Sequence, residues 1–244
     1  MKNKTLWKQV GAAAIAAAMV MSTVPATPVQ AAGGKTLAVS SQKQLNQALK
    51  TVKGKNAVIT VKAGKNVKIT IPKGTYKVTI RVVGKKAAVV NNGTVKEIVV
   101  NSKGTVAIKN NGTIKKVTVQ NAKSVSFSGN HKKAVPVVVN AEDVSMILAA
   151  PAKITPKKDV NIVLKKGAEK SSITCTKNVQ AQVDNQTKKA ISVKIADGTT
   201  LKVESGESCT ITPKGKKEDT SGEDKTDGKD QKTDDTSDGN ASSG

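Results

Sequence analysis

The stretch NNGTVKEIVVNSKGTVAIK, residues 91–109, is followed directly by NNGTIKKVTVQNAKSVSFS, residues 110–128. These are two copies of one 19-residue unit, and each copy opens with Asn-Asn-Gly-Thr. Within each copy apolar and polar residues alternate, which indicates short β-strands with one buried face. A short repeat of fixed period predicts an architecture in which each copy packs on the copy before it.

The same alternation extends over residues 55–213, in short runs separated by Gly, Asn, Lys or Pro. An antiparallel sandwich or barrel and a parallel β-solenoid both fit this pattern. The repeat favours the solenoid, because stacked coils place equivalent residues in the same environment. Asn92, Asn111 and Asn130 recur at steps of 19 residues, which predicts a ladder of stacked side-chain amides. We therefore expect an all-β chain of about eight coils.

Residues 1–31 have the pattern of a secretory signal peptide. Lys2, Lys4 and Lys8 precede a short apolar run at residues 10–21, and residues 29–31 form a small-residue cleavage motif. The apolar run is too short to span a bilayer. We therefore predict cleavage before Ala32, a secreted mature chain and no transmembrane segment in it.

Residues 32–54 are expected to form an N-terminal cap that consists of a short strand and an amphipathic helix. Ser41 and Gln44 have the spacing of a capping box, and Gly54 is a plausible helix stop. Four apolar residues share one helical face: Leu45, Ala48, Leu49 and Val52. Such a helix can cover the open end of a solenoid, where strand edges and core would otherwise face water.

Residues 214–244 differ sharply in composition from the chain before them. They contain six lysines, nine acidic residues and a single aliphatic side chain, Ala241. A segment that can bury so little is expected to be disordered. Residues 32–213, by contrast, hold 32 basic and nine acidic residues, a formal charge of +23. The strong basicity therefore belongs to the folded body.

Two segments near the N-terminus carry a family resemblance: SSQKQLNQALKTVKGKNAVITVKAGKN at residues 40–66 and PKGTY at residues 72–76. This helix, first strand and Gly-Thr-Tyr turn resemble the start of pectin-lyase-like proteins. The resemblance implies a single-stranded right-handed parallel β-helix. The family includes polysaccharide lyases and hydrolases, and also secreted, adhesin-like modules without catalysis.

Lyases of this family hold calcium with aspartates and use an arginine or lysine as the base. Arg81 has apolar neighbours and is expected to point outward from a strand. Glu142-Asp143 is the one close acidic pair in the body that stands out, and it is expected to form a turn. The remaining aspartates are scattered: Asp159, Asp184 and Asp197. We therefore predict no catalytic residue, no metal site and no cofactor, with a polysaccharide lyase as the alternative.

His131, the sole histidine, lies in a Gly-Asn-His-Lys segment and is expected to be a turn residue. Two cysteines, Cys175 and Cys209, allow one disulfide at most. The 19-residue period places them about two layers apart, near 10 Å, which is farther than a disulfide reaches. Secretion favours a bridge and the register opposes it. We predict two core thiols without a disulfide.

Lysine is the remaining functional signal. Lys96 and Lys115 match at a step of 19, with Lys133 a further 18 on, and Lys103 and Lys123 match at a step of 20. Stacking places these like charges on adjacent layers, which costs stability. Their role is either to keep exposed β-structure soluble, in a purely structural scaffold, or to bind polyanions.

The favoured function is a non-enzymatic, secreted or cell-surface module that binds anionic polymers. The candidate ligands are acidic polysaccharides and teichoic acid, and retention at the cell wall would be electrostatic. Sequence-specific binding of nucleic acid is not expected, because arginine and aromatic side chains are nearly absent. We expect a monomer.

Overall fold

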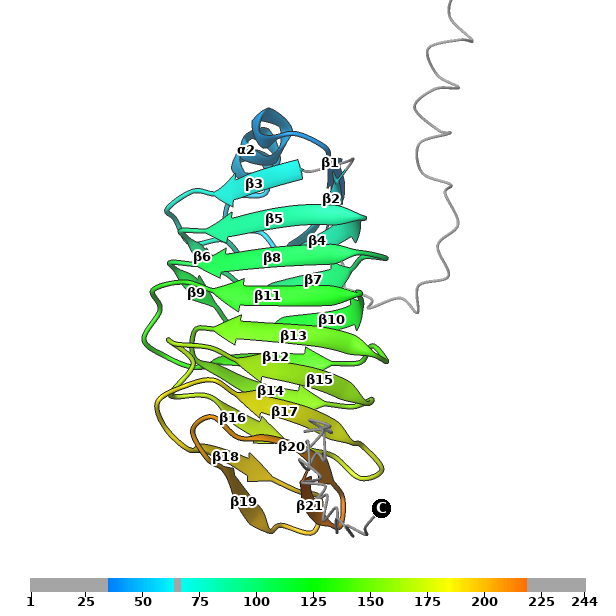
Figure 1. Ribbon diagram of the computed structural model, residues 1–244. Coiled ribbons are helices and arrows are strands. Elements are labelled where there is room, and N and C mark those ends of the chain that lie inside the picture. Colours follow the sequence, from blue (N-terminus) through cyan, green and yellow to red (C-terminus); the bar gives the residue numbers. More distant parts are fainter. Residues whose placement is uncertain (1–34, 64–66, 219–244) are drawn as a thin grey trace, which may run out of the picture.

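The computed structural model describes residues 35–63 and 67–218, in which the chain winds as a right-handed solenoid from α2 at one end to β21 at the other (Figure 1). Two large sheets form its opposite faces. The predicted signal peptide and its cleavage site lie outside the described residues. The all-β solenoid with an N-terminal helix is confirmed.

Sheet A has ten strands, in the spatial order β1 (Lys35–Val39), β2 (Ala57–Ala63), β4 (Val78–Gly84), β7 (Glu97–Asn101), β10 (Val117–Asn121), β12 (Val135–Val139), β14 (Ala152–Pro156), β16 (Ser172–Thr174), β18 (Ile191–Lys194) and β19 (Thr200–Val203). Sheet B has nine strands, in the order β21 (Gly215–Glu218), β20 (Ser208–Thr212), β17 (Ala181–Asn185), β15 (Val160–Leu164), β13 (Val144–Ala149), β11 (Ser124–Ser128), β8 (Thr105–Asn110), β5 (Lys86–Asn91) and β3 (Val67–Ile71). A third, two-stranded sheet joins β6 (Thr94–Val95) to β9 (Thr113–Ile114).

Each coil contributes one strand to sheet A and the next strand to sheet B. Seven such pairs follow one another, β2–β3, β4–β5, β7–β8, β10–β11, β12–β13, β14–β15 and β16–β17, and β18 starts an eighth coil. Neighbouring strands in this series are parallel, so that Val89, Ile108 and Phe127 occupy one register row. This row is buried, as are its equivalents in sheet A. The core is therefore a stack of aliphatic layers in which Phe127 is the one fully buried aromatic residue of the described chain.

Two amide ladders mark the start of the 19-residue units. In the outer ladder, Asn111 Nδ2 donates to Asn92 Oδ1 at 3.0 Å, as the sequence predicts. Asn130 does not extend this ladder through its side chain; its backbone N–H donates to the Asn110 carbonyl at 3.1 Å. In an inner ladder, the buried Asn91 Nδ2 donates to Asn110 Oδ1 at 2.8 Å. The first Asn of each pair thus points into the core.

The N-terminal cap is formed by β1 and by helix α2 (Gln42–Thr51). Ser41 caps the helix by accepting a hydrogen bond from the Gln44 N–H, and Gln44 Oε1 accepts one from the Ser40 N–H at 2.7 Å. The buried face contains Leu45, Ala48 and Leu49, as predicted. The Gln42 side chain pairs with backbone groups at the exposed edge of β3, because its amide donates to Thr70 O at 2.8 Å and accepts from Thr70 N at 2.7 Å.

We predict that Gln42→Glu weakens the attachment of the cap. A carboxylate cannot donate to Thr70 O, and it would also face Asn46 Oδ1, to which Gln42 Nε2 donates at 2.8 Å. The expected loss is about 1–3 kcal/mol of unfolding free energy, measured by urea denaturation. Gln47→Glu, on the exposed face of the same helix, is the control and is expected to change stability by less than about 0.5 kcal/mol. Equal losses in both variants would contradict the role assigned to Gln42.

The C-terminal end closes by reversing strand direction. Strand β19 is antiparallel to β18, β20 is antiparallel to β17, and β21 is antiparallel to β20. The expectation that stacked parallel coils continue to residue 213 is therefore wrong for β19 and β20, because alternating polarity does not encode strand direction. The expectation that the disordered tail starts at residue 214 is also wrong, since Gly215–Glu218 forms β21. The rest of the tail lies outside the described residues.

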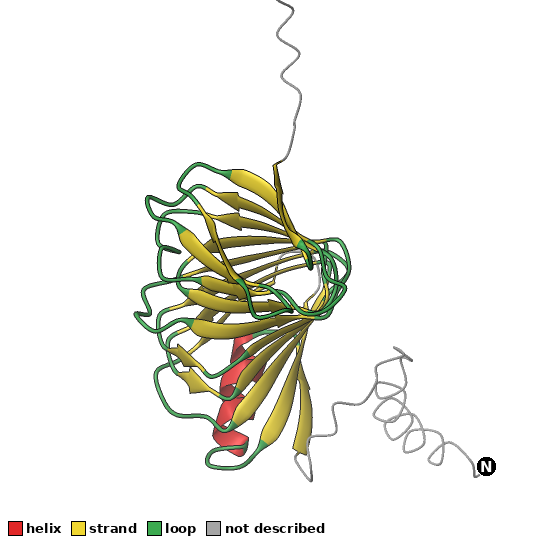
Figure 2. Ribbon diagram, turned by 90° about the horizontal axis from the view of Figure 1, so that it is seen from below, coloured by secondary structure: helices red, strands yellow, loops and turns green. Residues whose placement is uncertain are grey.

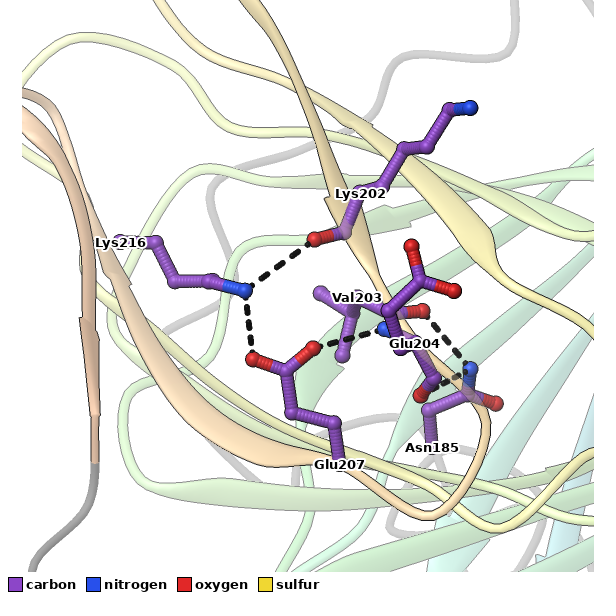
Figure 3. A network of polar contacts seen from close by, with 6 residues as sticks. All are labelled: Asn185, Lys202, Val203, Glu204, Glu207 and Lys216. Atoms are coloured by element: carbon purple, nitrogen blue, oxygen red, sulfur yellow. Dashed lines mark hydrogen bonds and ion pairs between the residues drawn. The ribbon is translucent and has the colours of Figure 1, made fainter.

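A polar network holds this C-terminal cap together (Figure 3). Asn185 Nδ2 donates to the carbonyls of Val203 and Glu204, each at 2.9 Å. The Glu207 carboxylate accepts from Lys216 Nζ at 2.5 Å and from the Glu204 N–H at 2.7 Å, and these bonds lower the pKa of Glu207. The ionised Glu207 carboxylate therefore stabilises the folded state above the ordinary glutamate pKa of about 4.3. This stabilisation is lost as pH falls through the lowered pKa.

Candidate functional site

The connections between the two sheets run along opposite edges of the solenoid. Figure 2, viewed along the axis, shows longer loops on the left and short turns on the right. We call the left edge, with connections from sheet B to sheet A, the loop edge; it includes residues 72–77, 92–96, 111–116 and 129–134. The right edge, from sheet A to sheet B, is the turn edge; it includes residues 85, 102–104 and 122–123.

Three exposed lysines of adjacent coils follow one another along the loop edge: Lys77, Lys96 and Lys115. We call them the lysine ladder. Lys96 and Lys115 are in register, since Thr94 pairs with Thr113 before them and Ile98 pairs with Val117 after them. Lys77 is displaced by one residue, because Thr75 pairs with Thr94 but Thr79 pairs with Glu97. Successive coils are about 4.8 Å apart. Within the described residues none of the three lysines forms an ion pair.

The lysine ladder differs from the predicted set at both ends. Lys133 is not its next member, because Val117 pairs with Val137, a step of 20 that puts position 135 in register with Lys115. Lys133 still lies on the loop edge, where it lines a depression together with Thr113 and Ile114. Lys77 was missed, although it precedes Lys96 by the 19 residues of the repeat.

The other two predicted lysines lie on the turn edge. Thr105 N donates to Lys85 O at 3.0 Å, and Lys123 N donates to Gly104 O at 2.9 Å. These bonds put Lys85, Gly104 and Lys123 in register on three adjacent coils, with Lys103 directly before Gly104. All three lysines are exposed. The turn edge therefore carries a second row of positive charge, on connections that are shorter than those of the loop edge.

The five predicted lysines thus do not form one face: Lys96, Lys115 and Lys133 lie on one edge, and Lys103 and Lys123 on the other. Between the edges, the outer surface of sheet B has an uncharged central row across five coils: Ala88, Ala107, Ser126, Ile147 and Val163. The same row has Lys68 on the coil before them and Asp184 on the coil after them. Over these five coils, rows of lysines flank it on both edges.

Charge is also graded along the axis. Residues 32–96, which include the cap and the first two coils, contain 14 basic residues and no acidic residue. Residues 97–141 contain seven basic residues and one acidic, and residues 142–213 contain 11 basic and eight acidic. The N-terminal end of the solenoid is therefore strongly cationic, and the positive electrostatic potential decreases along the axis toward the C-terminal end.

Arg81, the residue considered as a catalytic base, points outward from β4 in register with Val99. It is half-buried rather than solvated, and its Nε is buried without a hydrogen-bond partner in the described part of the chain. Glu97, on the neighbouring strand, accepts from Thr118 Oγ1 at 2.6 Å and pairs with Lys116 at 3.3 Å. Its carboxylate is therefore already engaged.

The fold brings two of the scattered aspartates together. Asp143 and Asp159 lie on adjacent coils, where Asp143 N donates to Asp159 O at 3.2 Å, and both line a polar pocket. Asp159 Oδ1 accepts from the Gln180 N–H at 2.9 Å. Glu142 turns away to pair with Lys158 at 2.8 Å. Among residues 35–63 and 67–218, no group of three His, Cys, Asp or Glu side chains could hold a metal ion.

His131 has a structural role. Its Nδ1 is 3.2 Å from Asn110 O, its Nε2 is 3.0 Å from Pro151 O, and its ring packs edge-on against Phe127. It bridges coils rather than presenting a free imidazole.

The cysteines lie on different sheets, since Cys175 follows β16 of sheet A and Cys209 pairs with Val183 in sheet B. The expectation that the period places the two cysteines two layers apart in one stack is therefore wrong. The two do not form a disulfide. Burial raises the pKa of the Cys175 thiol to about 11, so it is protonated at neutral pH and is not a nucleophile.

Comparison with known proteins found no matching family model, no matching curated relative and no matching solved structure. The likeness to pectin-lyase-like proteins therefore consists of the parallel β-solenoid fold and its N-terminal helix. In the described residues no helix has the length and apolar character needed to cross a membrane, and α2 has 10 residues.

Proposed function

We propose that this protein is a secreted, non-enzymatic module that binds anionic polymers along its cationic edges. The observation that carries the proposal is the lysine ladder. Its lysines recur once per coil, the backbones of successive coils are about 4.8 Å apart, and none of the three pairs with a carboxylate among the described residues. A polymer with regularly repeated negative charges can place successive charges on successive coils.

Electrostatics favour a ligand over a purely structural role for these lysines. Like charges directly opposite each other on neighbouring strands are destabilising. The spacing of the coils is shorter than the Debye length of about 8 Å at physiological salt, so that salt screens the repulsion only in part. A polyanion bound along the edge relieves it. Lys116 and Lys158, in contrast, are each paired with a glutamate.

The test is the salt dependence of binding to polygalacturonate, measured by titration calorimetry over a range of salt concentrations. In the variant Lys77→Gln/Lys96→Gln/Lys115→Gln, we expect affinity to fall about 100-fold at physiological salt, because each lysine contributes about 1 kcal/mol of binding free energy. The slope of log affinity against log salt should fall by about two.

The matched control is Lys188→Gln/Lys194→Gln/Lys202→Gln, which removes the same charge from exposed sites near the other end. We expect it to lose less than about fivefold, because it retains the ladder. Equal losses in the two variants would show that only net charge matters and would support the scaffold alternative. Release of unsaturated uronides in the presence of calcium would support the lyase alternative instead.

A further inference from the structure

A cleft lies at the cationic end of the solenoid, between α2 and the connection from β3 to β4. The helix contributes Asn46, Leu49 and Lys50 to its lining, the turn after it contributes Lys53, and the connection contributes Lys73 and Tyr76. These two segments are separated in the sequence by the whole of β2 and β3. The cleft contains no acidic residue among its lining residues.

The lining of the cleft combines two kinds of chemistry. Lys50, Lys53 and Lys73 are exposed and supply three ammonium groups. Leu49, only 2% exposed, and the half-buried Tyr76 supply an apolar wall. Tyr76 and these three lysines thus line one hollow. An apolar wall with a few charged groups is typical of small-ligand sites.

The cleft is held in shape from both sides. Gln42 attaches α2 to Thr70 of β3 through two hydrogen bonds of 2.8 and 2.7 Å. On the other side, the Tyr76 hydroxyl donates to Lys73 O at 3.2 Å, and the Tyr76 N–H donates to Thr94 O at 2.8 Å. Because both walls are fixed before a ligand arrives, little ordering is needed on binding.

We propose that this cleft binds one acidic sugar residue of the polymer whose chain then continues along the lysine ladder. The inference rests on the proposed function for the class of ligand. Lys77, the first member of the ladder, directly follows Tyr76 of the cleft wall, so the two sites are contiguous. A sugar ring offers an apolar face to Leu49 and Tyr76 and an anionic group to the lysines. A glycerol-phosphate chain, as in teichoic acid, offers charge but no ring.

The test uses the full chain and a trigalacturonate, which is too short to occupy both the cleft and the whole ladder. Titration calorimetry is expected to show one bound trisaccharide per chain. Lys50→Gln/Lys53→Gln/Lys73→Gln should weaken this binding at least tenfold. The ladder variant Lys77→Gln/Lys96→Gln/Lys115→Gln has the same net charge and should weaken it less than threefold.

The outcomes separate this inference from the proposed function. If polygalacturonate binds and the trisaccharide does not, or if both triple variants lose trisaccharide binding equally, the cleft site is wrong and the edge proposal stands. If a glycerol-phosphate trimer binds as tightly as trigalacturonate, the assignment to a sugar ring is wrong. If neither the polymer nor the trisaccharide binds, the proposed function itself fails. Stronger loss in the cleft variant than in the ladder variant supports the inference.

Discussion

Gly129→Ala is expected to lower the unfolding free energy by about 4 kcal/mol, the largest loss among single substitutions on the exposed turns. Two costs combine at this position. The backbone φ of Gly129 is +134°, a conformation that L side chains rarely adopt, and an added Cβ would lie 1.9 Å from Asn110 O of the preceding coil. The clash is with backbone, so no side-chain movement can relieve it. Equilibrium denaturation in urea measures the loss.

Gly198→Ala is the matched control for this substitution. Gly198 also has a positive φ, +94°, but an added Cβ would meet nothing within 4 Å. It should therefore show only the conformational cost, about 1 kcal/mol. The difference between the two variants isolates the steric requirement of coil stacking. If Gly129→Ala is no more harmful than Gly198→Ala, the coils are not as tightly stacked at this corner as the structure indicates.

The repeat predicted the fold well because stacking imposes the same environment at each step. Thr94–Thr113 and Val95–Ile114 pair at the 19-residue period, and Lys96 and Lys115 follow them in register. The prediction failed where a connection changed length. Val117 pairs with Val137, one position beyond the period of the repeat, and this extra residue displaces Lys133 from the ladder. Periodicity locates residues only as long as every loop keeps its length.

Two features needed three-dimensional information. The direction of β19, β20 and β21 could not be derived, since parallel and antiparallel strands share the alternation of polar and apolar residues. The cleft could not be derived either, because Lys50 and Tyr76 come from separate segments that meet only after α2 packs on the end of the sheets. The edge on which each lysine lies likewise depends on the connection that it occupies. Lys77 alone could have been found from the sequence, because it lies 19 residues before Lys96.

Replacing the inner amide ladder should be nearly as harmful as the Gly129 clash. Asn91 is completely buried; its Nδ2 donates to Gly93 O at 2.9 Å and to Asn110 Oδ1 at 2.8 Å, and its Oδ1 accepts from the Gly93 N–H at 3.2 Å. Asn91→Leu keeps the branching of the side chain but leaves these groups without their partner, at roughly 1–3 kcal/mol for each buried unsatisfied group. We expect a loss of about 3 kcal/mol of unfolding free energy, measured by urea denaturation.

Asn111→Ala is the control. It removes the equivalent bond to Asn92 from the exposed outer ladder, where water replaces the partner, and should cost less than about 1 kcal/mol. Similar losses in both variants would mean that stacking of the amides, rather than satisfaction of buried groups, accounts for the repeated Asn-Asn pair.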